Sequence, residues 1–367
     1  MLSLLEKSSW FHDNFDTNSL MELGSGGFGS VFTALSLKGN KKLAIKVLKP
    51  DPLNDIKDML NEVSLIVSLK KCKNVIQIKD TFTDTSKGQV MFSMELGDGS
   101  LDQFIKNFHN KRLKPTLLPQ ILADCLDALI FAADRSISHL DIKPANIIYF
   151  KTDDRTRKKG LQTDTIDDKS LIFKISDWGG GIMRANKTKM HSSNFGFTMG
   201  YAANEILNNS AFNGNKADVF SLGMSLLACC GIPYSEFKHL SSFPKATSYY
   251  RELEELLDTL DNGYNEIKVL LKEMIKYDFE ERIGLEELRE RILSLNDNEN
   301  FVCSSKLPVK DIRKKEENKI PNVIVQNKYS CNIKIILIRK KSVRGIHLAS
   351  ISLISFMKNF NYFISFC

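Results

Sequence analysis

The first half of the sequence alternates between short apolar runs and breaks rich in glycine or polar residues, which is typical of strands joined by turns. One stretch differs: over residues 52–71 apolar side chains recur at helical spacing, and Asp51 and Pro52 supply a helix N-cap and a first-turn proline. We therefore expect one amphipathic helix among strands. The expected strands are two around a glycine turn within 17–37, one at 43–47, one at 75–78 and one at 90–94.

The second half is dominated by helical spacing. Pro119 opens a long helix that is predicted to run to about Arg135. Two apolar strands follow, one at 147–150 and one that begins at Leu171 and runs into Asp177. The charged, aperiodic stretch 151–170 between them is expected to be a solvated loop insertion. Further helices are predicted near 249–260, 264–277 and 285–294.

Composition adds little to this picture until the charge is divided along the chain. The 367 residues, 43% hydrophobic and 26% charged, are those of an ordinary globular protein with room for a large core and two lobes. The net charge of +7 comes from residues 301–367, which hold 13 Lys and Arg against 3 Asp and Glu. The other 300 residues are slightly acidic, so the charge gives no reason to expect nucleic-acid binding.

The cysteines and the N-terminus bear on the compartment. Seven cysteines are scattered without a C-x-x-C or metal-ligand spacing, which predicts reduced, buried thiols. The N-terminus has no apolar stretch long enough for a signal peptide. We expect an intracellular protein, cytoplasmic, nuclear or both.

Residues 139–146 carry the most specific chemistry in the sequence. They read His-Leu-Asp-Ile-Lys-Pro-Ala-Asn, which resembles the catalytic loop H-R-D-x-K-x-x-N of eukaryotic protein kinases. The resemblance implies that Asp141 takes the proton of the substrate hydroxyl, Lys143 lies near the moving phosphoryl group, and Asn146 binds metal. The alternative is a polar turn between a helix and a strand.

A glycine turn strengthens this resemblance. Gly24, Gly26, Gly29 and Val31 match the kinase pattern G-x-G-x-x-G-x-V, although dinucleotide-binding folds share the glycines. A dinucleotide site needs a helix directly after the turn, whereas here a strand pattern continues. By the resemblance, the ATP-binding residues are Gly24, Ser25, Gly26, Gly27, Phe28, Gly29, Val31, Ala44, Lys46, Met94, Glu95, Gly97 and Ile148, with 95–97 as the hinge whose backbone pairs with the adenine edge.

Three further residues complete the machinery that the resemblance implies. Lys46, in a strand similar to the family's V-A-I-K, would hold the α- and β-phosphates, and Glu62, in the helix that follows, would orient it. Asp177 opens a D-W-G in place of the family's D-F-G and would bind Mg²⁺ together with Asn146. The alternatives are a surface lysine and a solvated helix glutamate.

The resemblance also implies how the C-terminal half is held together. Thr198 would contact Asp141 and Lys143, and Glu205, at the end of a segment similar to T-x-x-Y-x-A-P-E, would form a buried pair with Arg282. Asp218 would hydrogen-bond the backbone of the catalytic loop. Trp178 would complete an apolar stack with Ile66, Ile78 and His139.

Two departures from the family pattern concern regulation and subfamily. Leu140 replaces the arginine that in many kinases clamps a phosphate on the activation loop, so Thr188, Ser192 and Ser193 lose their most obvious partner. We expect activity to survive phosphatase treatment of the purified protein. Short matches around 139–147, 203–205 and 217–223 are similar to the Wee/Myt kinases.

The resemblance thus implies an α+β, bilobal fold with a small β-rich N-lobe (17–96) and a larger helical C-lobe (97–295), between an N-terminal extension (1–16) and a basic, disordered tail (296–367). The expected activity is transfer of the γ-phosphoryl of Mg-ATP to Ser or Thr of a protein substrate. The alternatives are a pseudokinase scaffold and a kinase-like fold acting on a small-molecule hydroxyl. The substrate and the oligomeric state stay open.

The last residues raise the question of a membrane anchor. Residues 346–367 are apolar but interrupted by Lys358, Asn359 and Asn361. A lysine in the middle of a span costs about 2.5–3.5 kcal/mol, so membrane attachment is not expected.

Overall fold

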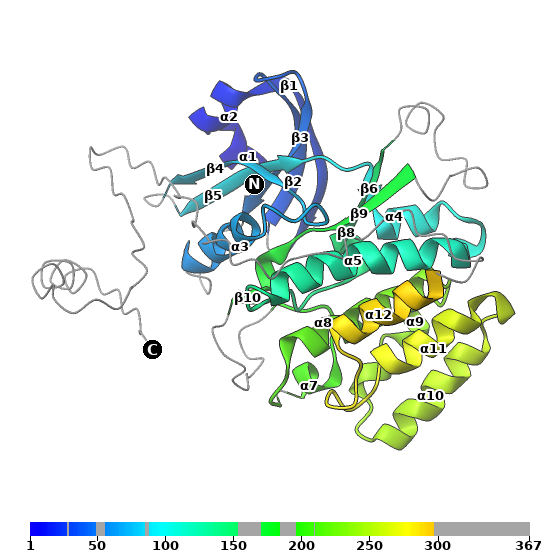
Figure 1. Ribbon diagram of the computed structural model, residues 1–367. Coiled ribbons are helices and arrows are strands. Elements are labelled where there is room, and N and C mark those ends of the chain that lie inside the picture. The colour runs from blue at the N-terminus through cyan, green and yellow to red at the C-terminus, as the bar shows by residue number, and fades with distance from the viewer. Residues whose placement is uncertain are drawn as a thin grey trace, which may run out of the picture. The chain divides into compact units, whose positions relative to one another are not determined.

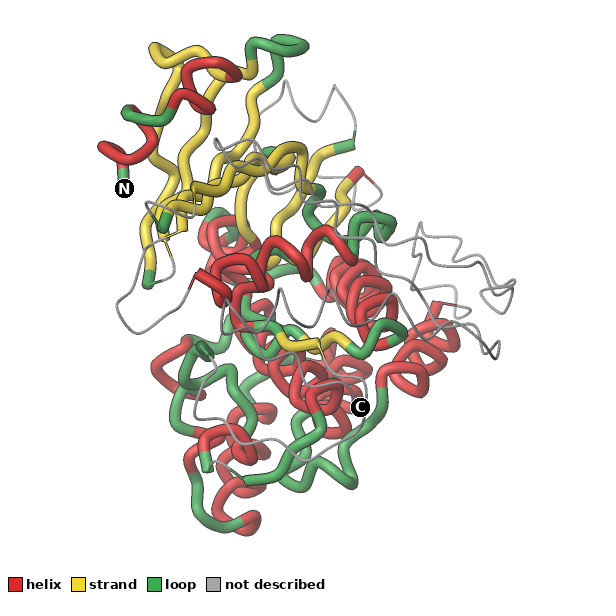
Figure 2. The backbone as a smooth tube through the Cα atoms, turned by 90° about the vertical axis from the view of Figure 1, so that its left-hand side faces the viewer, coloured by secondary structure: helices red, strands yellow, loops and turns green. Residues whose placement is uncertain are grey.

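The structure is a computed structural model that describes residues 1–27, 29–48, 56–84, 88–152, 170–183, 196–208 and 210–296. All of them lie in one compact unit, Met1–Glu316. Phe28, most of the predicted loop insertion, the phosphorylatable residues at 188–193 and the tail lie outside the described residues. Figure 1 shows the arrangement of the elements, and Figure 2 shows strands gathered in the N-lobe and helices in the C-lobe. The bilobal α+β fold is confirmed.

The N-lobe is built on a five-stranded antiparallel sheet with the order β1-β2-β3-β5-β4. The only long helix of its described part is α3 (Ile56–Ser68), where Met59, Val63 and Ile66 are buried at helical spacing. The strands are β1 (Phe15–Gly26), β2 (Gly29–Ser36), β3 (Lys42–Leu48), β4 (Ile78–Asp84) and β5 (Gln89–Glu95).

Residues 1–14, which the sequence left without predicted structure, form two short helices on this sheet (Figure 1). They are α1 (Leu2–Glu6) and α2 (Ser9–Asn14). Leu5, Trp10 and Phe11 are buried in one apolar cluster with strand residues such as Phe32 and Ile45. We call α1 and α2 the N-terminal cap.

The strand predicted at 75–78 was placed wrongly, since β4 begins only at Ile78. The backbone before Ile78 hydrogen-bonds to β9 (Leu171–Ile175) instead of to the N-lobe sheet. The N–H of Ile76 donates to Ile175 O at 3.0 Å, and the N–H of Ile175 donates to Asn74 O at 2.8 Å. The apolar pattern was real, because Val75 and Ile76 are buried, but these residues join the two lobes instead of lengthening the sheet.

The C-lobe is centred on α5 (Leu118–Ala133), close to the predicted 119–135. Pro115–Ala133 has the length and apolar composition of a membrane span, but most of it is buried against β9, α8 and α12. The other helices are α4 (Leu101–Lys106), α7 (Asn204–Leu207), α8 (Gly214–Cys229), α9 (Tyr234–Phe237), α10 (Ala246–Asp258), α11 (Asn265–Met274) and α12 (Leu285–Asn296).

Two small sheets connect these helices to the site. One has the order β6-β8-β9, with β6 (Gly99–Ser100) and β8 (Ile147–Lys151); the other pairs β7 (Ile137–Ser138) with β10 (Ile182–Met183). Lys151 pairs with Leu171, so the predicted insertion is narrower than 151–170 at its edges. Single 3-10 turns lie at His109–Lys111, Pro115–Leu117, Pro144–Asn146, Trp178–Gly180, Leu240–Ser242 and Asn262–Tyr264.

Candidate active site

Asp141 lies at the centre of a polar cluster between β7 and β8. Its Oδ1 accepts a hydrogen bond from Thr198 Oγ1 at 2.7 Å, and its Oδ2 accepts from Lys143 Nζ at 2.7 Å and from Asn146 Nδ2 at 3.2 Å. Lys143 also donates to Thr198 at 2.6 Å. Three side chains, the most distant of them 57 residues along the chain, therefore fix this carboxylate in one orientation.

The loop that carries Asp141 is held from beneath by α8. Asp218 accepts the N–H of His139 at 2.8 Å and that of Leu140 at 2.7 Å, as expected. Burial raises the pKa of Asp218 to about 7, although both hydrogen bonds favour the ionised form. Leu140 needs this anchor, because its φ of 65° is left-handed and costs a non-glycine residue about 1–2 kcal/mol.

His139 is fully buried and uses both ring nitrogens. Nδ1 accepts the N–H of Asp141 at 3.2 Å, so Nε2 carries the proton and donates to Ser176 O at 2.9 Å. Burial lowers the pKa of His139 despite neighbouring groups that raise it. A neutral imidazole therefore couples the catalytic loop to the strand that ends at Asp177.

Lys46 joins Glu62 and Asp177 in one ion cluster, in which Lys46 and Glu62 are buried and Asp177 is half-buried. Its Nζ lies 2.6 Å from Glu62 Oε1 and 2.6 Å from Asp177 Oδ1. Burial lowers the pKa of Lys46, but the two carboxylates outweigh it and raise the pKa. Burial raises the pKa of Glu62 to about 7 against the effect of Lys46, whereas for Asp177 the lysine outweighs burial and lowers the pKa. The two carboxylates thus hold the ammonium of Lys46 in its charged form.

The sheet residues predicted to bind ATP share one face. Val31 is paired with Lys46, and Ala44 is paired with Met94, so these four side chains project to the same side. At the turn, Gly24 pairs with Val31, and Gly29 packs so tightly that a Cβ would collide with the carbonyl of Val47. A Cβ on Gly24, Gly26 or Gly27 would meet no described atom within 4 Å, which leaves the loop backbone open to a ligand.

The predicted hinge, residues 95–97, lies over β8. Gly97 sits directly on Ile148, where a Cβ would collide with the Ile148 side chain. The Glu95 side chain turns away and accepts two hydrogen bonds from Lys174. Lys174 was missed in the sequence, where only its place in the strand 171–175, opposite Ile148, could have indicated it.

The donors of the predicted metal site suit Mg²⁺. Asn146 donates its Nδ2 hydrogens to Asp141, which leaves its amide oxygen to face a cation, and Asp177 supplies a carboxylate. Within the described ranges no three His, Cys, Asp or Glu side chains form a metal-binding group. A site with one or two protein carboxylates is the usual arrangement where substrate phosphates complete the coordination of Mg²⁺.

Trp178 lies directly under this site and is fully buried. Its ring centroid is 4.6 Å from that of His139, as predicted. Ile66 and Ile78 belong to the same large core cluster as Trp178, and the predicted stack with them stays a prediction. The indole Nε1 of Trp178 has no acceptor within the part of the chain that the structure describes.

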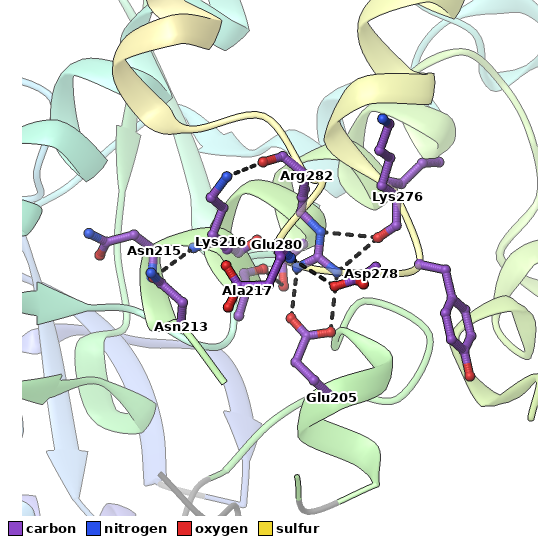
Figure 3. Close-up of polar contacts among 12 residues, drawn as sticks. Glu205, Asn213, Asn215, Lys216, Ala217, Lys276, Asp278, Glu280 and Arg282 are labelled. Carbon is purple, nitrogen blue, oxygen red and sulfur yellow. Dashed lines mark hydrogen bonds and ion pairs between the residues drawn. The ribbon is translucent and has the colours of Figure 1, made fainter. Parts of the chain in front are cut away.

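The predicted pair of Glu205 and Arg282 is present and buried (Figure 3). Arg282 Nη1 lies 2.7 Å from Glu205 Oε1, and Nη2 lies 3.2 Å from Oε2. The guanidinium also donates to the carbonyl oxygens of Lys216 and Lys276. It thereby ties the end of the segment that carries Thr198 to α8 and to the region before α12.

Known protein kinases resemble this chain over 69% to 75% of its length. One relative is the LEAF RUST 10 disease-resistance locus receptor-like protein kinase-like 2.1 of Arabidopsis thaliana, 29% identical over 69% of this chain and 38% of its own. Calcium-dependent protein kinase 5 of Plasmodium berghei is 26% identical over 75% of this chain and 46% of its own, and CBL-interacting serine/threonine-protein kinase 16 of Arabidopsis is 24% identical over 73% and 54%.

The chain thus spans about half or less of the length of these relatives. The Wee/Myt similarity stays a prediction. The family model for the protein kinase domain matches residues 17–292, about three quarters of the sequence. The matched region begins just after the N-terminal cap and ends in α12. The chain belongs to the protein kinase domain family.

Proposed function

We propose that this protein is an active kinase that transfers the γ-phosphoryl group of ATP to serine or threonine hydroxyls of protein substrates. The observation that carries the proposal is the hydrogen-bonded group of Asp141, Lys143 and Thr198 beside the Lys46 ion cluster. The five residues on which phosphoryl transfer in this family depends are present as Lys46, Glu62, Asp141, Asn146 and Asp177.

Each side chain has a task in this proposal. Asp141 accepts the proton of the substrate hydroxyl, and Thr198 and Lys143 hold its carboxylate toward that hydroxyl. The Lys143 ammonium also stabilises negative charge that develops on the phosphoryl oxygens. Lys46 binds the phosphates that stay behind, and Glu62 keeps it extended. Asn146 and Asp177 would hold Mg²⁺, which neutralises charge on the phosphates.

Serine and threonine are favoured as acceptors by the contents of the loop. Lys143 stands two residues after Asp141 and bonds Thr198, an arrangement similar to serine/threonine-type loops. Protein substrates are supported by the intact segment from Thr198 to Glu205, which leaves Met199 61% exposed beside Asp141.

Incubation of the purified protein with Mg-ATP and a degenerate peptide library, read by mass spectrometry, tests the proposal. We expect phosphorylated Ser and Thr in selected sequence contexts. The Asp141→Asn variant should lose at least about a hundredfold in rate, the usual contribution of a positioned base. Asp134→Asn, on an exposed residue after α5, is the matched control and should retain the wild-type rate.

No transfer by the folded wild-type protein, to peptides or to itself, would favour the pseudokinase. Full activity of Asp141→Asn would refute the assignment of the base. Phosphotyrosine as the sole product would refute the acceptor class.

A further inference from the structure

An ion pair links Glu95 of the hinge to Lys174. Lys174 Nζ, from β9, donates to Glu95 Oε1 at 2.8 Å and to Oε2 at 3.0 Å. Both side chains are largely buried, with 14% and 20% of their surfaces exposed. The same ammonium lies 4.7 Å from the ring centroid of Phe150, which adds a cation–π contact. A lysine so enclosed has little freedom to exchange Glu95 for water.

The position of Lys174 is set by the strand that forms the floor of the proposed adenine site. Lys174 pairs with Ile148 across β8 and β9, and paired residues project to the same face of a sheet. That face supports the hinge, because Gly97 rests on Ile148. Lys174 and Ile148 therefore hold the hinge at two points: an ion pair at Glu95 and a packing contact at Gly97.

A third attachment reaches the hinge from the segment between α3 and β4. The Gln77 N–H donates to Glu95 Oε1 at 2.8 Å, and the Glu95 N–H donates to Gln77 O at 3.0 Å. The Gln77 amide in turn donates to the carbonyls of Cys72 and Val75 at 2.8 and 2.7 Å. The Glu95 carboxylate thus unites β9, the hinge and the connection that follows α3.

We propose that Lys174 is a positioning residue for the nucleotide: by holding Glu95, it fixes the backbone of residues 95–97 in the orientation that pairs with the adenine edge. The inference rests on the proposed function only in taking residues 95–97 as the base-binding hinge. Adenine and guanine present different donors and acceptors on that edge, so a fixed backbone selects between them. A loosened backbone binds adenine less tightly and rejects guanine less strongly.

Removal of the lysine should act on binding more than on chemistry. In Lys174→Met the stem still packs, but the Glu95 carboxylate loses its cation and is drawn toward water, which frees the hinge. Lys174 is three residues from Asp177 and is not among the groups around Asp141, so kcat should change less than the KM for ATP. Lys174→Arg keeps the charge and can reach the carboxylate with two N–H groups.

Isothermal titration of the full-length protein with Mg-ADP and with Mg-GDP tests the inference without relying on activity. For Lys174→Met we expect the Kd for ADP to rise about threefold to tenfold, and the ratio of the Kd values for GDP and ADP to fall by at least threefold. Lys174→Arg should restore most of both values. Lys272→Met, which breaks the exposed 2.6 Å pair with Glu254, is the matched control and should change neither.

A Lys174→Met protein with a lowered melting temperature but unchanged Kd values would show that the pair is merely structural and would overturn the inference. A wild-type protein that binds neither nucleotide would overturn it as well. A wild-type protein that selects ADP through Lys174 but transfers no phosphoryl group would leave the inference standing and refute the proposed function.

Discussion

At the scale of single residues, the loop of residues 139–146 is held in place by buried side chains. Leu140 replaces a charged family residue, and its side chain is 1% exposed in the core of the C-lobe. The left-handed turn at this residue is stabilised by Asp218, which lies on α8. The expectation that activity survives dephosphorylation stays a prediction, now with a physical basis in this anchor.

The buried His139 should make the stability of the protein depend on pH. The pKa of His139 is lowered from 6.5 in the folded protein. Below about pH 6.5 the unfolded chain therefore binds a proton that the native state refuses, and stability is lost as the pH falls. A proton on Nδ1 would also face the Asp141 N–H. Urea unfolding should show that the free-energy advantage of wild type over His139→Gln shrinks from about pH 7.5 to about pH 5.5.

The quantity to follow is the difference in free energy of unfolding between wild type and His139→Gln. The free energy of wild type alone is not enough, because Glu62 and Asp218 change stability with pH in the opposite direction. Their pKa values are raised to about 7, so each binds a proton more readily when folded and favours folding at lower pH. A constant difference for His139→Gln across this range would refute the neutral, buried imidazole.

At the scale of elements, the sequence did not predict the N-terminal cap, nor the helices α4 and α8. The helices of the cap have five and six residues, too short for a helical period to stand out. Their apolar side chains are buried by packing on the face of the sheet that carries Phe32 and Ile45, and this packing cannot be read from the local sequence. The helical spacing of apolar residues predicted α3 and α5 correctly because both helices are long. In α3 the apolar residues lie on one face, and α5 is almost wholly buried. The prediction failed at Val75 and Ile76 because burial between lobes leaves the same pattern as a strand.

Trp10 should decide how much the cap contributes to stability. Its ring packs on Phe15 and Phe82, and its Nε1 donates to Asp80 at 3.0 Å. Trp10→Ala should lower the free energy of unfolding by about 3–5 kcal/mol, as expected for a buried aromatic residue, measured in urea.

Trp10→Phe is the matched variant for the cap, because it keeps an aromatic ring while it removes part of the indole and the hydrogen bond to an exposed carboxylate. It should cost clearly less than Trp10→Ala, about 1–2 kcal/mol. A Trp10→Ala protein whose free energy of unfolding lies within about 1 kcal/mol of the wild-type value would behave like a surface variant. That result would mean that the cap detaches freely in solution.

At the scale of the whole molecule, the site is assembled by contacts between distant parts of the chain. Motif spacing predicted the partners of Asp141, Lys46 and Arg282, since each belongs to a family pattern. The ion pair of Glu95 with Lys174 spans 79 residues and belongs to no such pattern, so neither local propensity nor periodicity could show it. Only the strand register, which places Lys174 opposite Ile148, brings it to the hinge.

Arg282 should be the most sensitive long-range contact in the C-lobe. Its side chain is 0% exposed and that of Glu205 is 4% exposed, so Arg282→Met leaves a buried carboxylate without its cation. Unfolding by urea should show a loss of about 3–5 kcal/mol. The double variant Glu205→Leu/Arg282→Met should recover much of it, because no buried charge remains.

The contrasting case is the surface pair of Lys272 and Glu254, with side chains 47% and 51% exposed. Lys272→Met should cost less than about 1 kcal/mol. Equal losses for Arg282→Met and Lys272→Met would contradict the account of the buried pair.

The burial of Trp178 has an optical consequence. The chain contains only two tryptophans, one in the N-terminal cap and one beside Asp177. A Trp10→Phe protein therefore has a single emitter, shielded from water and 4.6 Å from the His139 ring. Its fluorescence would follow events around Asp177 directly, so nucleotide entry could be timed in a stopped-flow instrument without any attached dye.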